Sequence, residues 1–420
     1  MINNQNSISV SAFLVKKCTL IYRLAQKYDT RVFLVGGLVR DLLSSNQSLS
    51  TARRRHSLWR RSTNQDLDIT IENSYQKFAE ELAYELKAMI THHPYFMTMN
   101  LQWKDGSHID IAQARTERYP KPAILPKASP AKIEEDLKRR DFSINAIAME
   151  ITAKLPYPIY DPFDGRGDLE KKLIRVLHPK SFIDDPTRIF RAIRFATRFR
   201  FKIEPLTTSL MQEAIKNNLL KLLSKERILN EIKLMLAEQK HIENIRCLQN
   251  YGIIANLFDL NLPKRFFDNN DKLTAYESDI KKIRLIYFLS YLPISHWRKY
   301  PLTTEIVEST YALIKFSKIR GHLAKAKKPS EIYKILKPLP IMVLEILSSI
   351  ESQTIKEKVK KYLNEYSKIT ISTNGNVLRS MKIQQGQLYT QILKQIRYEK
   401  LDGKIKTKQD EINYIKMKYG

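Results

Sequence analysis

Two carboxylates stand two residues apart, at Asp66 and Asp68, in a segment where polar and apolar residues alternate up to Ile71. Alternate residues of a strand point to the same face, so a strand here places both carboxylates together, about 7 Å apart along the chain. Neighbouring carboxylates repel each other, and a divalent cation relieves that repulsion. Because both ligands are oxygens, the pair predicts Mg²⁺ or Mn²⁺ rather than Zn²⁺.

A pair of glycines, Gly36 and Gly37, follows the apolar run 32–35 and precedes a predicted helix. Glycines at this place let the backbone approach a phosphate, and a helix N-terminus attracts the anion. Arg40, one turn into the helix, adds a cationic fork. A tight turn would explain the glycine pair alone, and a solvated strand would explain the carboxylate pair alone. The two pairs together favour a nucleotide site.

A hairpin is predicted around Asp105-Gly106, between two alternating strands within 101–111. Asp110 falls on the polar face of the second strand. It is therefore a candidate third carboxylate beside Asp66 and Asp68, and an exposed strand residue is the alternative.

Adjacent arginines occur at Arg139 and Arg140. Such a pair opposite a metal suits a triphosphate, whose remaining oxygens need neutralising. Arg140 is the predicted nucleotide ligand, with Asp141 and Asn145 holding that arginine or the ribose. For Asp141, a buried structural ion pair is the alternative.

A helix is predicted from Pro186, which suits the first helical position after the acidic Asp185. Arg188, Arg191 and Arg194 recur every three residues and share one side of this helix. A solvated basic face is the common explanation of such spacing.

Together these segments resemble the class II tRNA nucleotidyltransferase and bacterial poly(A) polymerase family, in the polymerase β-like superfamily. The similar segments are Gly36-Gly37-Leu38-Val39-Arg40-Asp41 with Asp66-x-Asp68, Arg139-Arg140-Asp141-Phe142-Ser143-Ile144-Asn145-Ala146, and Asp184-Asp185-Pro186-Thr187-Arg188. The proline-rich stretch 117–132 and the tail 374–408 resemble the Aquifex- and cyanobacterial-type CCA-, CC- or A-adding members. The chain departs from the pattern in Asp184, where Glu is usual, and in a longer link at 44–65. That link is rich in arginine and is either an RNA-facing loop or a disordered insert.

The resemblance implies addition of C and/or A to the tRNA 3′ end from CTP and ATP, with pyrophosphate release and two Mg²⁺ ions. It implies metal binding by Asp66 and Asp68, assistance from Asp110, and triphosphate binding by a set of backbone and cationic groups at Gly36, Gly37, Arg40 and Arg140. It further implies that Asp185 and Arg188 read the base, supported by Arg191 and Arg194. A poly(A) polymerase and a catalytically inactive RNA-binding protein remain alternatives.

Composition is consistent with a polyanionic partner, because 72 Lys and Arg against 44 Asp and Glu give a net charge of +28. An AT-rich genome would also raise the Lys content. The two cysteines fit no metal spacing and suggest a reducing compartment, which we expect to be the bacterial cytoplasm or plastid stroma. No stretch is long and apolar enough to cross a membrane, and the first residues do not resemble a signal or transit peptide. The oligomeric state stays open.

The predicted fold class is α+β, with a mixed sheet followed by helical domains. We expect a catalytic head at 1–150, a helical neck with the base-reading residues at 151–240, and a tRNA-binding helical body and tail at 241–420. Helices are expected at 11–28 and 75–91. The segment 160–169 is expected to be a turn-rich connector, and Glu226 and Arg227 are interpreted as structural.

Overall fold

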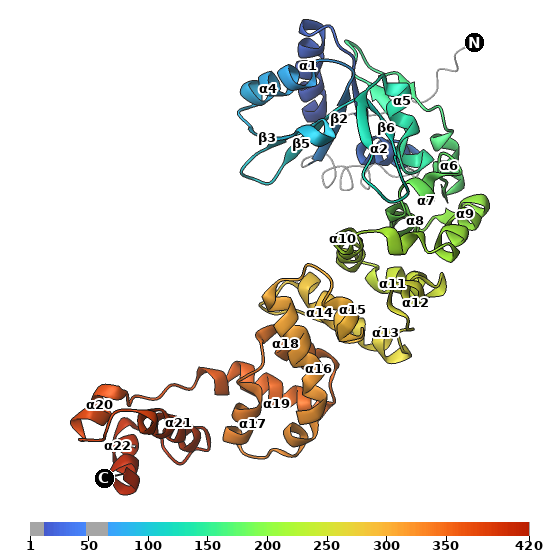
Figure 1. Ribbon diagram of the computed structural model, residues 1–420. Helices are drawn as coiled ribbons and strands as arrows, with labels where there is room; N and C mark the ends of the chain where they lie inside the picture. The colour runs from blue at the N-terminus through green and yellow to red at the C-terminus, as the bar shows by residue number, and fades with distance from the viewer. Residues whose placement is uncertain (1–11, 48–65, 420) are drawn as a thin grey trace. The chain divides into compact units, whose positions relative to one another are not determined.

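The computed structural model describes residues 12–47 and 66–419 (Figure 1). The chain forms two compact units. The first comprises 1–231 and 238–257, and the second comprises 232–237 and 258–420. The first unit carries a mixed β-sheet and the second is helical, which confirms the predicted α+β class. No helix in the described ranges is long and apolar enough to span a membrane.

The main sheet has seven strands in the order β3-β4-β5-β2-β1-β8-β9. Their bounds are β1 (Val32–Val35), β2 (Asp66–Ile71), β3 (Met89–His93), β4 (Thr98–Gln102), β5 (His108–Gln113), β8 (Ala148–Glu150) and β9 (Ile159–Tyr160). β2 and β5 run parallel, and every other pair in this sheet is antiparallel. Asp105-Gly106 forms the expected turn between β4 and β5.

One face of the sheet is covered by helices α1 (Ala12–Lys27) and α4 (Tyr75–Leu86), which lie together in Figure 1. Side chains that alternate with the carboxylates, such as Ile69 and Ile71, are buried on this face. The prediction of a helix through residue 91 is wrong. α4 ends at Leu86, because Lys87 adopts a left-handed conformation (φ 53°) and turns the chain into β3.

The proline-rich segment forms a two-stranded antiparallel hairpin of β6 (Arg115–Arg118) and β7 (Lys127–Pro130), separate from the main sheet. The prolines lie in its turn and at the end of β7, where a missing N–H breaks no central ladder. The stretch therefore forms a separate hairpin and, as predicted, neither a helix nor a central strand of the main sheet.

Further helices follow in the first unit and lead into the second. They are α2 (Gly37–Gln47), α5 (Ile133–Lys138), α6 (Gly165–Lys171), α7 (Ser181–Asp184), α8 (Thr187–Phe199), α9 (Pro205–Lys216), α10 (Lys225–Ala237), α11 (His241–Asn250) and α12 (Ile253–Phe258). Two short strands, β10 (Leu173–Ile174) and β11 (Lys202–Ile203), pair in parallel. The segment 160–169, expected to be a connector, contributes the start of α6.

The helices of the second unit are α13 (Lys264–Asn270), α14 (Ile280–Ser290), α15 (Ile294–Trp297), α16 (Thr304–Lys325), α17 (Pro329–Leu336), α18 (Ile341–Ile350), α19 (Gln353–Asn364), α20 (Gly375–Ser380), α21 (Gln387–Leu401) and α22 (Lys408–Tyr419). One apolar cluster joins α16 to α19, and another joins α20 to α22. Among the described residues after β11 no strand occurs, as the sequence predicts.

Candidate nucleotide-binding site

Two of the three predicted carboxylates, Asp68 and Asp110, lie on the sheet face opposite α1 and α4. Asp68 of β2 is the register partner of Asp110 of β5, so the two occupy the same face of adjacent parallel strands. Asp66 begins β2 as predicted, but its side chain lies outside the described part of the structure. Within the described side chains no cluster of three or more His, Cys, Asp or Glu could hold a metal ion. Asp68 and Asp110 are therefore the two predicted carboxylates whose side chains the structure describes.

Asp110 is held by its neighbours. Asn100 donates a hydrogen bond from Nδ2 to Oδ1 of Asp110 at 2.6 Å. Nε2 of His108 lies 3.6 Å from Oδ2 of the same carboxylate, which is half exposed. The side chain is thus oriented while one side stays open to solvent.

Gly36 is required by geometry. Its φ is +69°, and a Cβ built on it would lie 3.2 Å from Oδ2 of Asp68. A left-handed conformation favours glycine, and a side chain would fill the space beside the carboxylate. The glycine therefore leaves an open space, a cradle, beside the Asp68 carboxylate.

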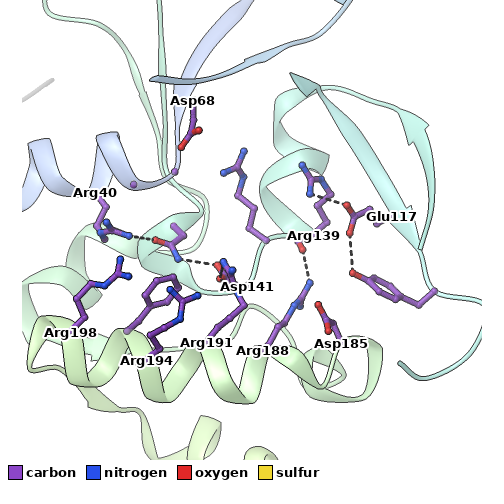
Figure 2. A pocket seen from close by; sticks show the side chains of 16 residues that line it. Arg40, Asp68, Glu117, Arg139, Asp141, Asp185, Arg188, Arg191, Arg194 and Arg198 are labelled. Atoms are coloured by element: carbon purple, nitrogen blue, oxygen red, sulfur yellow. Dashed lines mark hydrogen bonds and ion pairs between the residues drawn. The ribbon is translucent and has the colours of Figure 1, made fainter. Parts of the chain in front are cut away.

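A pocket of about 550 Å³ opens beside this cradle (Figure 2). It lies entirely within the first unit and contains seven arginines against four carboxylates. Its lining residues are Gly36, Gly37, Arg40, Asp68, Glu117, Tyr119, Arg139, Arg140, Asp141, Asn145, Asp185, Arg188, Arg191, Arg194, Phe195 and Arg198. Every predicted nucleotide-binding residue is among them, whereas Asp110 is outside. The volume and the cationic excess suit a nucleoside triphosphate.

Arg140 is held by Asp136, a fully buried residue of α5. Oδ2 of Asp136 accepts from Nη2 of Arg140 at 2.9 Å, and Oδ1 accepts from Nη2 of Arg139 at 2.7 Å. Burial alone would raise the pKa of Asp136, but the two guanidinium groups prevail and lower it. The expectation that Asp141 or Asn145 holds Arg140 is therefore wrong, because a carboxylate one helical turn earlier already does so. Their other expected role, at the ribose, stays a prediction.

Asp141 and Asn145 instead link two other predicted arginines. Nη1 of Arg40 donates to Oδ1 of Asn145 at 2.8 Å, and Nδ2 of Asn145 donates to Oδ1 of Asp141 at 3.0 Å. Arg191 closes the chain with an ion pair of 2.5 Å to Oδ2 of Asp141 (Figure 2). Burial opposes ionisation of Asp141, yet Arg191 and Asn145 hold its pKa below the usual value. The alternative of a buried ion pair at Asp141 is the one observed.

The arginines of α8 do not form a solvated face. Arg188 and Arg194 are only 4% and 6% exposed. Arg188 donates from Nη1 to Oγ of Ser181 and from Nη2 to the carbonyl oxygen of Arg139, each at 2.7 Å. Arg188 and Asp185 thus have separate supports, and both line the pocket.

Several lining residues were not predicted. Burial raises the pKa of Tyr119, so its hydroxyl stays protonated and donates to Oε2 of Glu117 at 3.0 Å. Oε1 of Glu117 accepts from Nη1 of Arg139 at 2.9 Å. Glu117 and Tyr119 come just before the prolines of the hairpin, and no local periodicity marks them. Phe195 could have been predicted as a lining residue, because it directly follows Arg194 on the helix predicted to carry the base-reading arginines.

Aromatic rings pack among the guanidinium groups at one end of the pocket. The centre of the Arg40 guanidinium lies 4.4 Å from the Phe199 ring, and those of Arg191 and Arg194 lie 5.3 and 5.1 Å from the Phe195 ring. Stacking of this kind keeps like charges apart in fixed positions.

Comparison with known proteins gives the family of the chain. The family described as "Poly A polymerase head domain" matches residues 32–175, and "Probable RNA and SrmB- binding site of polymerase A" matches residues 200–263. The chain belongs to the tRNA nucleotidyltransferase and poly(A) polymerase family. The family resemblance drawn from the motifs is thereby confirmed.

Two relatives in this family carry the name "A-adding tRNA nucleotidyltransferase". The Aquifex aeolicus protein is 34% identical over 365 residues, which cover 81% of this chain and 41% of that protein, so the chain spans less than half of its length. The Halalkalibacterium halodurans protein is 29% identical over 405 residues, covering 94% of this chain and 90% of that protein. A solved structure described as "The complex structure of CCA-adding enzyme with ATP" superimposes with a TM-score of 0.79 at 26% identity and covers 99% of both chains.

Proposed function

We propose that the protein is a tRNA nucleotidyltransferase that adds C and/or A to the tRNA 3′ end from CTP and ATP. The observation that carries the proposal is a single pocket. Asp68 lies at one side of it and Asp185 and Arg188 at another, and further arginines line it (Figure 2). Gly36 lies beside Asp68. Transfer of a nucleotide needs these three parts together: an oxygen-rich centre for the reacting phosphate, cations for the triphosphate, and polar groups for the base.

Nucleotidyltransferases of this family are metal-dependent, and Mg²⁺ is the ion we propose. The observed residues fit such an ion, since the oxygens of Asp68 face the cradle that Gly36 leaves open and Asp110 is its register partner. Asp66 and Asp68 would hold it, with Asp110 nearby. When bound, the metal supplies activation of the RNA 3′-hydroxyl and charge neutralisation at the α-phosphate.

The triphosphate is assigned to Arg40 and Arg140 with the backbone of Gly37. Both side chains are pre-oriented, Arg40 by Asn145 and Arg140 by Asp136. Guanidinium groups already held in place need little further ordering when the anion binds.

The base is assigned to Asp185 and Arg188. Cytosine and adenine each present an amino donor beside a ring-nitrogen acceptor, which a carboxylate and a guanidinium complement. Uracil and guanine present a carbonyl and an N–H there, leaving buried polar groups unpaired. A pocket built to pair such groups rejects the wrong base strongly.

A addition is the subtype we favour among CCA, CC and A addition. The Halalkalibacterium halodurans relative, which bears that name, aligns over nearly the whole length of both chains. For the cellular setting, the two reduced cysteines favour the bacterial cytoplasm or the plastid stroma. The three-part division into head, neck and tRNA-binding body and tail stays part of this proposal.

The test is to incubate the purified protein with Mg²⁺, CTP, ATP and four RNAs. Three are tRNAs ending before CCA, after one C, and after CC, and the fourth is an unrelated oligonucleotide. We expect the tRNA that ends after CC to be extended by one A, to CCA. Extension of the two shorter tRNAs would identify CC or CCA addition instead. Long A tracts on the unrelated RNA would make the protein a poly(A) polymerase.

A matched variant separates catalysis from binding. Asp68→Asn should abolish transfer while leaving tRNA binding and the thermal unfolding temperature near those of the wild type, because the change removes one charge at nearly constant volume. Retained turnover would contradict the carboxylate assignment. An inactive wild-type protein that binds tRNA would instead favour the RNA-binding alternative.

A further inference from the structure

The guanidinium of Arg227, on α10, lies between two parts of the first unit that are far apart in sequence. Its Nη1 donates to the carbonyl oxygen of Ala123 in the turn of the β6–β7 hairpin, at 2.8 Å. Its Nη2 donates to Oδ1 of Asp185 at 2.7 Å. One rigid fork therefore ties the hairpin turn to the carboxylate assigned to base reading.

The side-chain hydrogen bonds that Asp185 accepts all fall on one of its two oxygens. Oδ1 accepts from the backbone N–H and the hydroxyl of Thr187, at 3.0 and 2.6 Å, as well as from Arg227. With three protein donors on Oδ1, and none on Oδ2 among the described residues, Oδ2 is the acceptor left for an exocyclic amino group. Without Arg227 the carboxylate would keep only the two bonds from Thr187 and could rotate.

The other end of the fork holds a strained turn. Ala123 is nearly buried and has a φ of +62°, a conformation that L residues rarely adopt. Such a conformation persists only where the surroundings impose it, and the bond to Arg227 is one such constraint. The same hairpin carries Glu117 and Tyr119 into the pocket.

We propose that Arg227 is a positioning residue that couples the hairpin turn to Asp185 and thereby sets base selectivity. The inference rests on the proposed function and deepens it. It also revises the interpretation of Arg227 as merely structural, because a brace for the fold alone would affect stability and leave the choice of base unchanged.

The test compares Arg227→Lys with the wild type. A lysine amine is a single point donor and cannot span both acceptors, while its charge and its partly exposed position keep the protein folded. We expect incorporation of U and G relative to C and A to rise about tenfold, the loss associated with one charge-assisted hydrogen bond. KM for the correct nucleotide should rise more than kcat falls.

Glu226→Ala is the matched control, since Glu226 is the exposed neighbour on the same helix and is not among the residues that line the pocket. A second readout is amide hydrogen exchange, without substrate, of the non-proline residues within 119–126. It should be faster in Arg227→Lys and unchanged in Glu226→Ala.

A folded Arg227→Lys protein with wild-type base selectivity would overturn the proposal, as would unchanged exchange in the turn. Failure of the wild-type protein to transfer C or A would instead overturn the proposed function. The exchange measurement would still report whether Arg227 holds the turn.

Discussion

Among single residues, Arg188 contributes most directly to base choice in our proposal. It is buried and its guanidinium is fixed by Ser181 and the backbone of Arg139. Arg188→Ala removes the donor to the ring nitrogen, so the preference for C and A over U and G should fall by about 10- to 100-fold. The relative kcat/KM values of the four nucleotides on a matched tRNA measure this ratio.

Arg198→Ala is the control for that experiment. Arg198 also lines the pocket but is ion-paired with Glu238 and partly exposed. Its loss should leave the ratio unchanged. If Arg188→Ala kept the wild-type ratio while nucleotide affinity fell, Arg188 would be a triphosphate ligand and not a base reader.

The thiol of Cys18 offers a test of the core of the first unit. Burial raises its pKa to about 11, even though a hydrogen bond with Tyr157 lowers it. The pKa in the folded protein exceeds the unfolded value of about 8.5. The stabilisation from burying the neutral thiol is therefore complete below about pH 8.5. It is lost as the pH rises through 11.

We therefore expect Cys18 to resist alkylation at pH 8 in the folded protein and to react rapidly in denaturant. Mass spectrometry of iodoacetamide-treated protein, with peptides assigned to each cysteine, measures this. Cys247 is more exposed and serves as the internal reference. Equal alkylation of both cysteines under native conditions would contradict the packing of α1 on the sheet.

Among the elements, α6 supports the pocket from outside it. A Cβ on Gly165, at the start of α6, would lie 2.3 Å from the carbonyl oxygen of Ser143. Asp168 of the same helix accepts a hydrogen bond of 2.5 Å from the Ser143 hydroxyl. The segment expected to be a connector is thus a close support for the turn that carries Asn145.

Gly165→Ala should destabilise the protein by about 1–3 kcal/mol, because backbone must move to admit the methyl group. Urea unfolding followed by circular dichroism measures the loss. Gly321→Ala is the control. It lies within α16, nothing lies within 4 Å of its built Cβ, and alanine favours a helix over glycine by about 1 kcal/mol. Equal stability of the two variants would contradict the tight contact.

For the whole molecule, the net charge of +28 predicts salt-sensitive binding of RNA. If about four phosphates are contacted, affinity for tRNA should fall by about 100-fold between 50 and 200 mM salt. Filter binding across this range gives the slope. A flat response would indicate that the excess charge reflects composition and not the binding of a polyanion.

Much of the first unit could be predicted from its sequence. Alternation of polar and apolar residues indicates β2 and β5, and Asp105-Gly106 indicates the hairpin between β4 and β5, because these signals are local. The same holds for the arginines of α8, whose spacing places them on one side of a helix. The Arg-rich insert remains a prediction, since 48–65 lies outside the described residues.

The sequence by itself determined the residue types of the site, the family and the α+β class. Only the tertiary structure decided which side chains are hydrogen-bond partners. Asp136 binds Arg140, Asn145 binds Arg40, and Arg227 binds Asp185. It also brought Glu117 and Tyr119 into the pocket. The physical reason is that side-chain periodicity reports local backbone geometry, whereas the partner of a buried charge depends on how distant segments pack.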